Sequence, residues 1–185
     1  AGVFYQVGHR YNHARSLCAR EPASLLICVN KTCFNGLHRV NRRGEFNVPA
    51  GRYAKPRILD EELLRAASAR LKSVELRCES FEALLSHAKP GDFIYFDPPY
   101  EPVSRTASFT AYQPDGFSSE DQTRLRDVFA ELDRRRCKLM LSNSDAPLIR
   151  ELYRKYRVDT VAAPRAINCD AKGRGRVTEL VVRNY

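Results

Sequence analysis

The tetrapeptide "DPPY" at residues 97–100 carries the side chains best suited to chemistry in this sequence of 185 residues. It follows the apolar run "FIYF", and two consecutive prolines cannot continue a ladder of backbone hydrogen bonds, so a strand is expected to end here. An exocyclic amino group on a nucleobase is a poor nucleophile because its lone pair is delocalised into the ring. Acceptors aimed at its N–H bonds favour a localised lone pair, and the Asp97 carboxylate and the Pro98 carbonyl can supply two of them.

The other residues of the tetrapeptide suit the same chemistry. Pro98 and Pro99 fix φ and hold the acceptor carbonyl in place without competing N–H groups. The Tyr100 ring can stack on the face of a base. Such a site acts by positioning and electrostatic preorganisation, without a covalent intermediate. A base in a duplex must first leave the stack, at a cost of about a few kcal/mol, so the pattern predicts a pocket for a flipped base.

From about residue 60 the sequence alternates helical and strand patterns, which predicts an α/β fold. Asp60 is the expected N-cap of the first helix, and Ser118 opens a capping box before the longest one. The predicted helices cover residues 61–71, 80–88, 122–135 and 147–156, and the predicted strands cover residues 73–78, 93–96, 138–143, 157–163 and 177–182. Uninterrupted apolar strands between helices predict a mostly parallel sheet covered on both faces, with a ligand site beyond the carboxyl ends of its strands.

The first 57 residues follow a different pattern and carry most of the net charge of +9. Helices are predicted over residues 4–17 and 23–33, followed by a β-hairpin at about residues 34–53. Arg43 lies at the tip of this hairpin, and Gly44 supplies the positive φ of the turn. Residues 1–58 have a formal charge of +8 and the remainder +1. This asymmetry suits a polyanion such as DNA or RNA, although a merely soluble basic surface would have the same composition.

The six cysteines lack C-x-x-C spacing and are interpreted as free thiols in a reducing compartment. His9, His13 and Cys18 could be drawn as a partial metal site, but the polar face of a helix is the simpler interpretation, and no metal is predicted. The sequence has no run of eighteen apolar residues and no charged-then-apolar leader, which favours a cytoplasmic protein without a membrane segment.

The whole pattern resembles the DNA adenine-N6 methyltransferases of the Dam type. The resemblance rests on "DPPY" with the following "EPVSRTASFTAY", and on "RGEFNVPAGRYAKP", "CESF", "GFSSEDQTRL", "LSNSD" and "GRGRVTELV". It implies an incomplete α/β class I (Rossmann-like) methyltransferase sheet over residues 58–185, and a small helical and β-hairpin DNA-recognition domain over residues 1–57. The implied reaction transfers a methyl group from S-adenosylmethionine to adenine N6 in double-stranded DNA, most often within GATC, by a bacterial or phage enzyme that is expected to be monomeric.

The resemblance also implies roles for individual residues. Asp97, Pro98, Pro99 and Tyr100 would hold and activate the flipped adenine, and Ser80, Phe81 and Asp97 would lie beside the methyl donor. Phe34 would stack in the duplex, Asn35 would help to fill the space left by the base, and Leu37 and Arg39 would read outer bases. The remaining implied DNA contacts are Lys31, Arg43, Pro49, Arg52, Tyr53, Ser104 and Thr106.

One departure from the family pattern concerns the donor. Related enzymes hold it with a glycine-rich turn after the first strand and an acid after the second, upstream of the recognition segment, and nothing in this sequence matches these. The chain is therefore expected to be the C-terminal two-thirds of a longer protein and to bind the donor poorly alone. Two alternatives remain: a non-catalytic DNA-binding remnant, which a donor-binding measurement distinguishes, and an RNA or protein amine methyltransferase, against which the basic hairpin argues.

Overall fold

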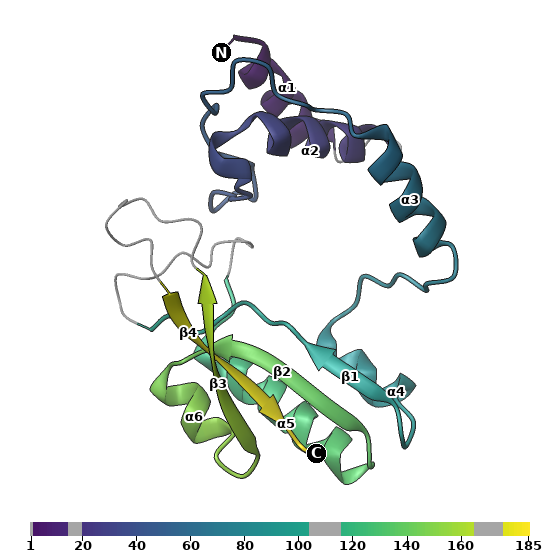
Figure 1. The fold of residues 1–185 in the computed structure, drawn as a ribbon, viewed down its shortest axis with the longest axis vertical. Helices are drawn as coiled ribbons and strands as arrows, with labels where there is room; N and C mark the ends of the chain where they lie inside the picture. The colour runs from purple at the N-terminus through teal and green to yellow at the C-terminus, as the bar shows by residue number, and fades with distance from the viewer. Residues whose placement is uncertain (1, 15–19, 104–115, 165–175) are drawn as a thin grey trace. The chain divides into compact units, whose positions relative to one another are not determined.

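The computed structural model describes residues 2–14, 20–103, 116–164 and 176–185, and these fall into two compact units that divide between Cys78 and Glu79. The residues up to Cys78 are called the first unit below, and those from Glu79 onward the second unit (Figure 1). None of the helices in these described ranges is long and apolar enough to cross a membrane.

The first unit is helical with one irregular hairpin. Its elements are α1 (Gly2–His13), α2 (Arg20–Thr32), the 3₁₀ turn η2 (Phe34–Gly36) and α3 (Glu61–Leu71). Helix α1 packs on α2, and a small core gathers Val29, Cys33, Phe46 and Val48. The predicted N-cap of α3 is confirmed, because an oxygen of the Asp60 carboxylate accepts a hydrogen bond from the backbone N–H of Leu63 at 3.2 Å.

The hairpin of the first unit is antiparallel but not a regular ribbon. Two isolated β-bridges join its arms within the described chain, Cys33 with Ala50 and Val40 with Phe46, together with backbone hydrogen bonds such as the one from the Asn47 N–H to the Arg39 carbonyl. Gly44 has a φ of 74°, as the turn requires, and its N–H donates to the Asn41 carbonyl. The recognition role of residues 1–57 remains a prediction.

The second unit is a four-stranded sheet with helices. Its elements are η3 (Phe81–Ala83), α4 (Leu84–His87), β1 (Phe93–Phe96), α5 (Ser119–Arg134), β2 (Lys138–Ser144), α6 (Pro147–Leu152), β3 (Arg157–Pro164) and β4 (Arg176–Arg183). The strand order is β1-β2-β4-β3, which together with the helices makes a mixed α/β fold consistent with the incomplete Rossmann-like sheet that was predicted (Figure 1). The capping box at Ser118 is confirmed.

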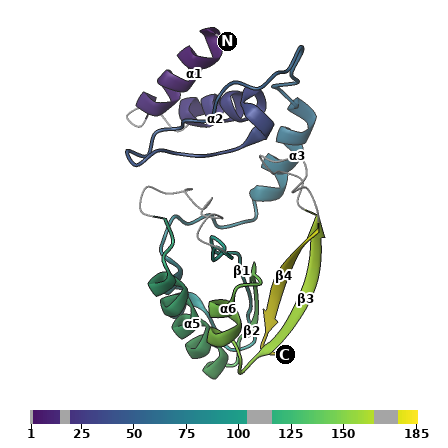
Figure 2. The same cartoon turned by 90° about the vertical axis from the view of Figure 1, so that its left-hand side faces the viewer.

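The core of the second unit lies between the sheet and helices α5 and α6, which occupy the same face of the sheet (Figure 2). Alternate strand residues point into it, as the fully buried Leu139 and Leu141 of β2 show. From α5 the residues at helical spacing, Leu125, Phe129 and Leu132, complete the same cluster.

Three sequence predictions about this sheet are wrong. The first is the mostly parallel arrangement, because only β1 and β2 pair in parallel, while β4 runs antiparallel to both β2 and β3. A buried apolar strand has the same composition in either direction, so composition alone does not reveal the reversal.

The second error is the coverage of both faces, because the helices described in this unit pack on one face of the sheet. Phe93 and Tyr95 point away from the helices, and their exposed fractions are 58% and 53%. The third error is the strand at residues 73–78, which form no strand and are exposed. An isolated strand has no partner for its backbone N–H and C=O groups, so the alternating pattern of "SVELRC" cannot produce one by itself.

Candidate active site and DNA-recognition surface

The candidate active site is the loop formed by residues 97–101, at the carboxyl end of β1, where the α/β pattern predicts a ligand site. Asp97 is exposed, while Pro98, Pro99 and Tyr100 are half-buried. The structure thus brings the four predicted catalytic residues together at one strand end. Their chemical roles stay predictions.

The fully buried amide side chains of Gln122 and Asn143 hold this loop in place through hydrogen bonds. The Gln122 amide nitrogen donates to the Pro99 carbonyl at 2.9 Å, and the Asn143 amide nitrogen donates to the Gln122 side-chain oxygen at 3.1 Å. The Asn143 side-chain oxygen accepts from the backbone N–H of Glu101 at 2.9 Å. Because a buried amide without a partner is costly, this chain of hydrogen bonds strongly favours one position of the loop.

The hydroxyl of Ser142 is bound to the acid at the start of the loop. The Ser142 Oγ donates to Asp97 Oδ1 at 2.9 Å, and the Tyr95 hydroxyl lies 2.8 Å from the same Oγ. Ser142 is almost fully buried, with an exposed fraction of 7%. The parallel register pairs Phe96 with Leu141, so Asp97, one residue further, comes next to Ser142.

Tyr100 lies in an acidic part of the site. Its hydroxyl donates to Glu179 Oε2 on β4 at 3.4 Å. Partial burial raises the pKa of the Tyr100 phenol, the hydrogen bond with Ser142 opposes this, and the carboxylates of Glu179 and Asp97 raise the pKa further. The phenol therefore stays neutral at physiological pH and keeps its O–H as a donor.

Ser80 and Phe81 are predicted to lie beside the methyl donor. Their segment and the loop both contact the N-terminal end of helix α5. Ser80 is the N-cap of η3, and the Phe81 ring meets the Arg124 guanidinium of α5 with 5.5 Å between the guanidinium carbon and the ring centroid. At the first turn of α5, the Ser119 hydroxyl donates to the Glu101 carboxylate at 3.1 Å. Both segments therefore contact the N-terminal turns of α5. Donor binding by Ser80 and Phe81 remains a prediction.

The predicted DNA contacts of the first unit are exposed, with one exception. Leu37 is half-buried and packs on the small core. The exposed residues are Lys31, Phe34, Asn35, Arg39, Arg43, Pro49, Arg52 and Tyr53. Ser104, Thr106 and Cys18 lie outside the described residues. DNA contact by these exposed residues remains a prediction.

Two of these residues have a defined local geometry. Arg39 Nε donates to the Asn47 side-chain oxygen at 2.8 Å, and an Nη of Arg39 donates to the Asn47 carbonyl at 3.1 Å. Asn35 has a φ of 54°, in the left-handed region that asparagine tolerates. The Arg39 head group is thus held by its partner on the other arm of the hairpin.

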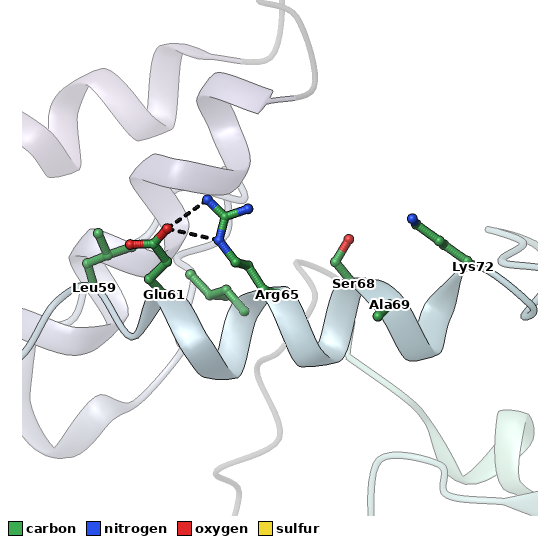
Figure 3. Close-up of a pocket in the computed structure, with 7 residues that line it drawn as sticks. Leu59, Glu61, Arg65, Ser68, Ala69 and Lys72 are labelled. Carbon is green, nitrogen blue, oxygen red and sulfur yellow. Dashed lines mark hydrogen bonds and ion pairs between the residues drawn. The ribbon is translucent and has the colours of Figure 1, made fainter.

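The described ranges contain no group of three or more His, Cys, Asp or Glu residues that could hold a metal, and their four cysteines, Cys28, Cys33, Cys78 and Cys137, are free thiols, as predicted. An open hollow of about 580 Å³ runs along α3, beside the Glu61–Arg65 ion pair, and includes none of the predicted site residues (Figure 3). Its lining residues are Leu59, Glu61, Leu64, Arg65, Ser68, Ala69 and Lys72.

Sequence reasoning missed Gln122, Ser142 and Asn143 as parts of this site. Two signals could have found them. Gln122 lies at helical spacing with Leu125 and Phe129, so it is a polar residue on an apolar face. Ser142 and Asn143 follow the apolar "LML" at the end of a strand that pairs with β1, where polar residues are expected to meet a ligand loop.

The chain is similar in sequence to several known methyltransferases. The chain is 44% identical over 167 residues to the Type II methyltransferase M1.LlaDCHI of Lactococcus lactis subsp. cremoris, covering 89% of this chain and 59% of that protein. It is 42% identical over 185 residues to the Type II methyltransferase M.MjaIII of Methanocaldococcus jannaschii, covering 98% of this chain and 64% of the relative. The DNA adenine methylase of Escherichia coli K12 is 36% identical over 181 residues, again covering 98% and 64%.

The chain therefore spans about six-tenths of the length of these relatives. The family pattern of the D12 class N6 adenine-specific DNA methyltransferases matches residues 1–167, which include the basic residues 1–57 and the loop at residues 97–101. S-adenosylmethionine is the methyl donor that this class implies. The chain belongs to the D12 class of N6 adenine-specific DNA methyltransferases.

Proposed function

We propose that the protein transfers a methyl group from S-adenosylmethionine to N6 of an adenine in double-stranded DNA, with GATC as the expected sequence. The observation that carries this proposal is the position of Asp97, an exposed carboxylate at the end of β1 on a loop that buried amides hold in place. We further propose that the protein acts as a monomer in the cytoplasm.

In this proposal the loop prepares the amino group for attack. Asp97 and the Pro98 carbonyl accept hydrogen bonds from the two N–H groups of the flipped base, and Tyr100 stacks on its face. The N6 lone pair forms the new bond to the methyl carbon, the carbon–sulfur bond breaks with its electron pair on sulfur, and N6 releases one proton to solvent. S-adenosylmethionine supplies a methyl group that is activated by a positive sulfur, and Ser80, Phe81 and Asp97 are the residues of this chain that would lie beside it.

The first unit provides the proposed contacts with the duplex. Arg39, held by Asn47, offers its remaining N–H groups to a guanine edge, and Leu37 offers an apolar contact to a thymine methyl group. Phe34 and Asn35 would take the place of the flipped base. Lys31, Arg43, Pro49, Arg52 and Tyr53 add contacts beside it, and Ser104 and Thr106 belong to the same proposal as phosphate contacts.

The test uses the protein as its gene encodes it, labelled S-adenosylmethionine, and three substrates: a GATC duplex, a duplex without GATC, and RNA. Asp97→Ala is expected to lower the methyl transfer rate at least about a hundredfold, because an acceptor aimed at the reacting group is lost. The DNA affinity should stay within about a few fold, since phosphate contacts dominate it. Asp127→Ala is the control, because Asp127 is an exposed residue of α5 paired with Arg126.

The outcomes separate the candidate functions. Transfer to the GATC duplex alone supports the proposal, whereas transfer to RNA would contradict it. DNA binding without any heat of donor binding in calorimetry would identify a non-catalytic DNA-binding protein. Retained turnover in Asp97→Ala would show that the carboxylate is not the acceptor.

A further inference from the structure

The open face of the sheet carries a row of hydroxyl groups that ends on the Asp97 carboxylate. Tyr95 and Ser142 lie on this face because the core-facing positions of their strands belong to Phe96 and Leu141. The Tyr95 hydroxyl lies 2.8 Å from Ser142 Oγ, which in turn lies 2.9 Å from Asp97 Oδ1. The row therefore connects two neighbouring strands to the residue that the proposed reaction needs.

The direction of the hydrogen bonds follows from counting protons. An ionised carboxylate only accepts, so the single hydroxyl proton of Ser142 goes to Asp97. Ser142 then has only acceptor capacity left, so the Tyr95 hydroxyl must donate to it, and the Tyr100 hydroxyl, which also interacts with Ser142, cannot receive a proton from it. One Asp97 oxygen is thereby fixed from within the protein, while the exposed carboxylate keeps its other oxygen for a ligand.

Burial makes this arrangement rigid. Ser142 has an exposed fraction of 7%, so water competes weakly for its hydroxyl, and its hydrogen bond to a charged group belongs to the stronger class. Its strand is central, paired with β1 on one side and β4 on the other. A hydroxyl on such a strand has little freedom to move away from the carboxylate.

We propose that Ser142 is a positioning residue that holds Asp97 in the rotamer needed to accept a hydrogen bond from the target amine, and that Tyr95 orients the Ser142 hydroxyl. This inference rests on the proposed methyl transfer and names residues that act in it through Asp97. Neither side chain needs to touch the base or the methyl donor.

The test measures steady-state methylation of a GATC duplex, DNA affinity and thermal unfolding for four single variants and one double variant of the protein as its gene encodes it. Ser142→Ala is expected to lower kcat about ten- to a hundredfold, the factor of one hydrogen bond to a charged group, with KM for DNA and DNA affinity within about twofold. Ser142→Thr keeps a hydroxyl and should recover most of the lost kcat. Ser86→Ala is the matched control, because the Ser86 hydroxyl only donates to the Ala83 carbonyl within its own helical turn.

The fourth variant, Tyr95→Phe, keeps the inference testable even if changes at the buried Ser142 disturb folding. Tyr95 is half-exposed and loses only its hydroxyl, and kcat should fall severalfold. In the Ser142→Ala background the same change should have no further effect, because Tyr95 acts through Ser142.

Several results would overturn the inference. One is an unchanged kcat in Ser142→Ala. Another is a double variant whose loss of kcat equals the product of the two single losses. A third is a loss that appears only in KM or in the unfolding temperature. A wild-type protein that methylates no DNA would instead overturn the proposed function, and the inference would be overturned with it.

Discussion

Gln122, Ser142 and Asn143 are buried polar side chains whose hydrogen bonds go to the loop at residues 97–101 or to its acid. Each would be costly to bury without a partner, so the hydrogen bonds to the folded loop are the physical reason that these three polar side chains can be buried. At the scale of single residues, positioning and stability are therefore coupled in this unit. A variant at any of the three is expected to affect both.

Tyr153 shows the opposite situation and gives a prediction about stability. It is fully buried, and its hydroxyl has no hydrogen-bond partner within the described part of the chain. Burial raises the pKa of this phenol. Tyr153→Phe should raise the free energy of unfolding by about 0.5–1 kcal/mol, because it removes a desolvated hydroxyl and keeps the ring contacts with Phe129.

The matched comparison is Tyr156→Phe, measured in the same urea titration. Tyr156 packs against the same Phe129 ring but hydrogen-bonds to the Asp133 side chain, so its change should lower the free energy of unfolding by about 1 kcal/mol. Equal losses in both variants would mean that the Tyr153 hydroxyl has a partner after all.

Among the elements of the second unit, helix α5 contacts the sheet, the loop at residues 97–101 and, through its C-terminal end, helix α4. Its N-terminal turns contact Glu101 through Ser119 and Phe81 through Arg124, and its apolar face covers the sheet. Near its C-terminus, the Glu131 carboxylate binds Arg134 and Arg135, and the Arg135 guanidinium also donates to the Leu85 carbonyl of α4. The helix thus links the sheet, the loop and α4.

This end of α5 gives a pH-dependent prediction. The hydrogen bonds from Arg134 and Arg135 lower the pKa of Glu131 from 4.5 to about 2. A carboxyl group whose pKa is depressed in the folded state contributes stability above its unfolded pKa and loses it as the pH falls toward the folded value. Glu131→Gln should therefore show a flatter decline of stability than wild type between about pH 4.5 and 2.

The measurement is thermal unfolding across this pH range, with Glu151→Gln as the control. Glu151 is exposed on α6 and pairs with Arg154 alone. Parallel curves for wild type and Glu131→Gln would show that this cluster adds nothing to acid sensitivity.

In the whole molecule, charge is segregated along the sequence. Residues 1–58 carry a formal charge of +8 and the remaining residues +1. The basic side chains proposed to meet DNA are exposed, whereas the arginines of α5 and α6 are in ion pairs, namely Arg124, Arg126, Arg134 and Arg150. We therefore expect the electrostatic part of DNA binding to depend on the first 58 residues.

Variants at Arg39 and Arg43 can distinguish recognition of a base from contact with the phosphate backbone. Arg39→Ala should relax base choice at one position by about 1–3 kcal/mol, since the proposed guanine contact of the Arg39 head group, which Asn47 holds, is lost. Arg43→Ala should weaken all duplexes alike and reduce the slope of log affinity against log salt by about 1. The measurement is fluorescence anisotropy with single-substituted GATC duplexes at several salt concentrations, and Arg154→Ala is the control in the second unit. Equal losses on every duplex for Arg39→Ala would make it a phosphate contact.

Local sequence signals predicted the local structure well. The N-cap at Asp60, the capping box at Ser118 and the positive φ of Gly44 depend on residues within one turn, and the structure confirms all three. The strand "FIYF" is also confirmed. A short apolar run between a glycine turn and two prolines is too short for a helix and suits a buried strand.

Non-local features could not be derived in the same way. The direction of β4 and the uncovered face around Tyr95 depend on which strands meet, and residues 73–78 form no strand despite their alternating pattern. Backbone pairing between distant segments determines these outcomes, and the sequence of one segment does not show which other segment pairs with it.

The sequence by itself indicated the proposed chemistry through the acid, the two prolines and the ring of "DPPY" and through the basic first 58 residues, and it also indicated the family to which the chain belongs. Only the tertiary structure decided what holds that chemistry in place. Ser142 reaches Asp97 from a strand 45 residues away in sequence, and Gln122 and Asn143 meet the loop from a helix and the same strand. The identity of a reactive group is a local property of the chain, whereas the orientation of that group depends on contacts that exist only after distant segments have packed together.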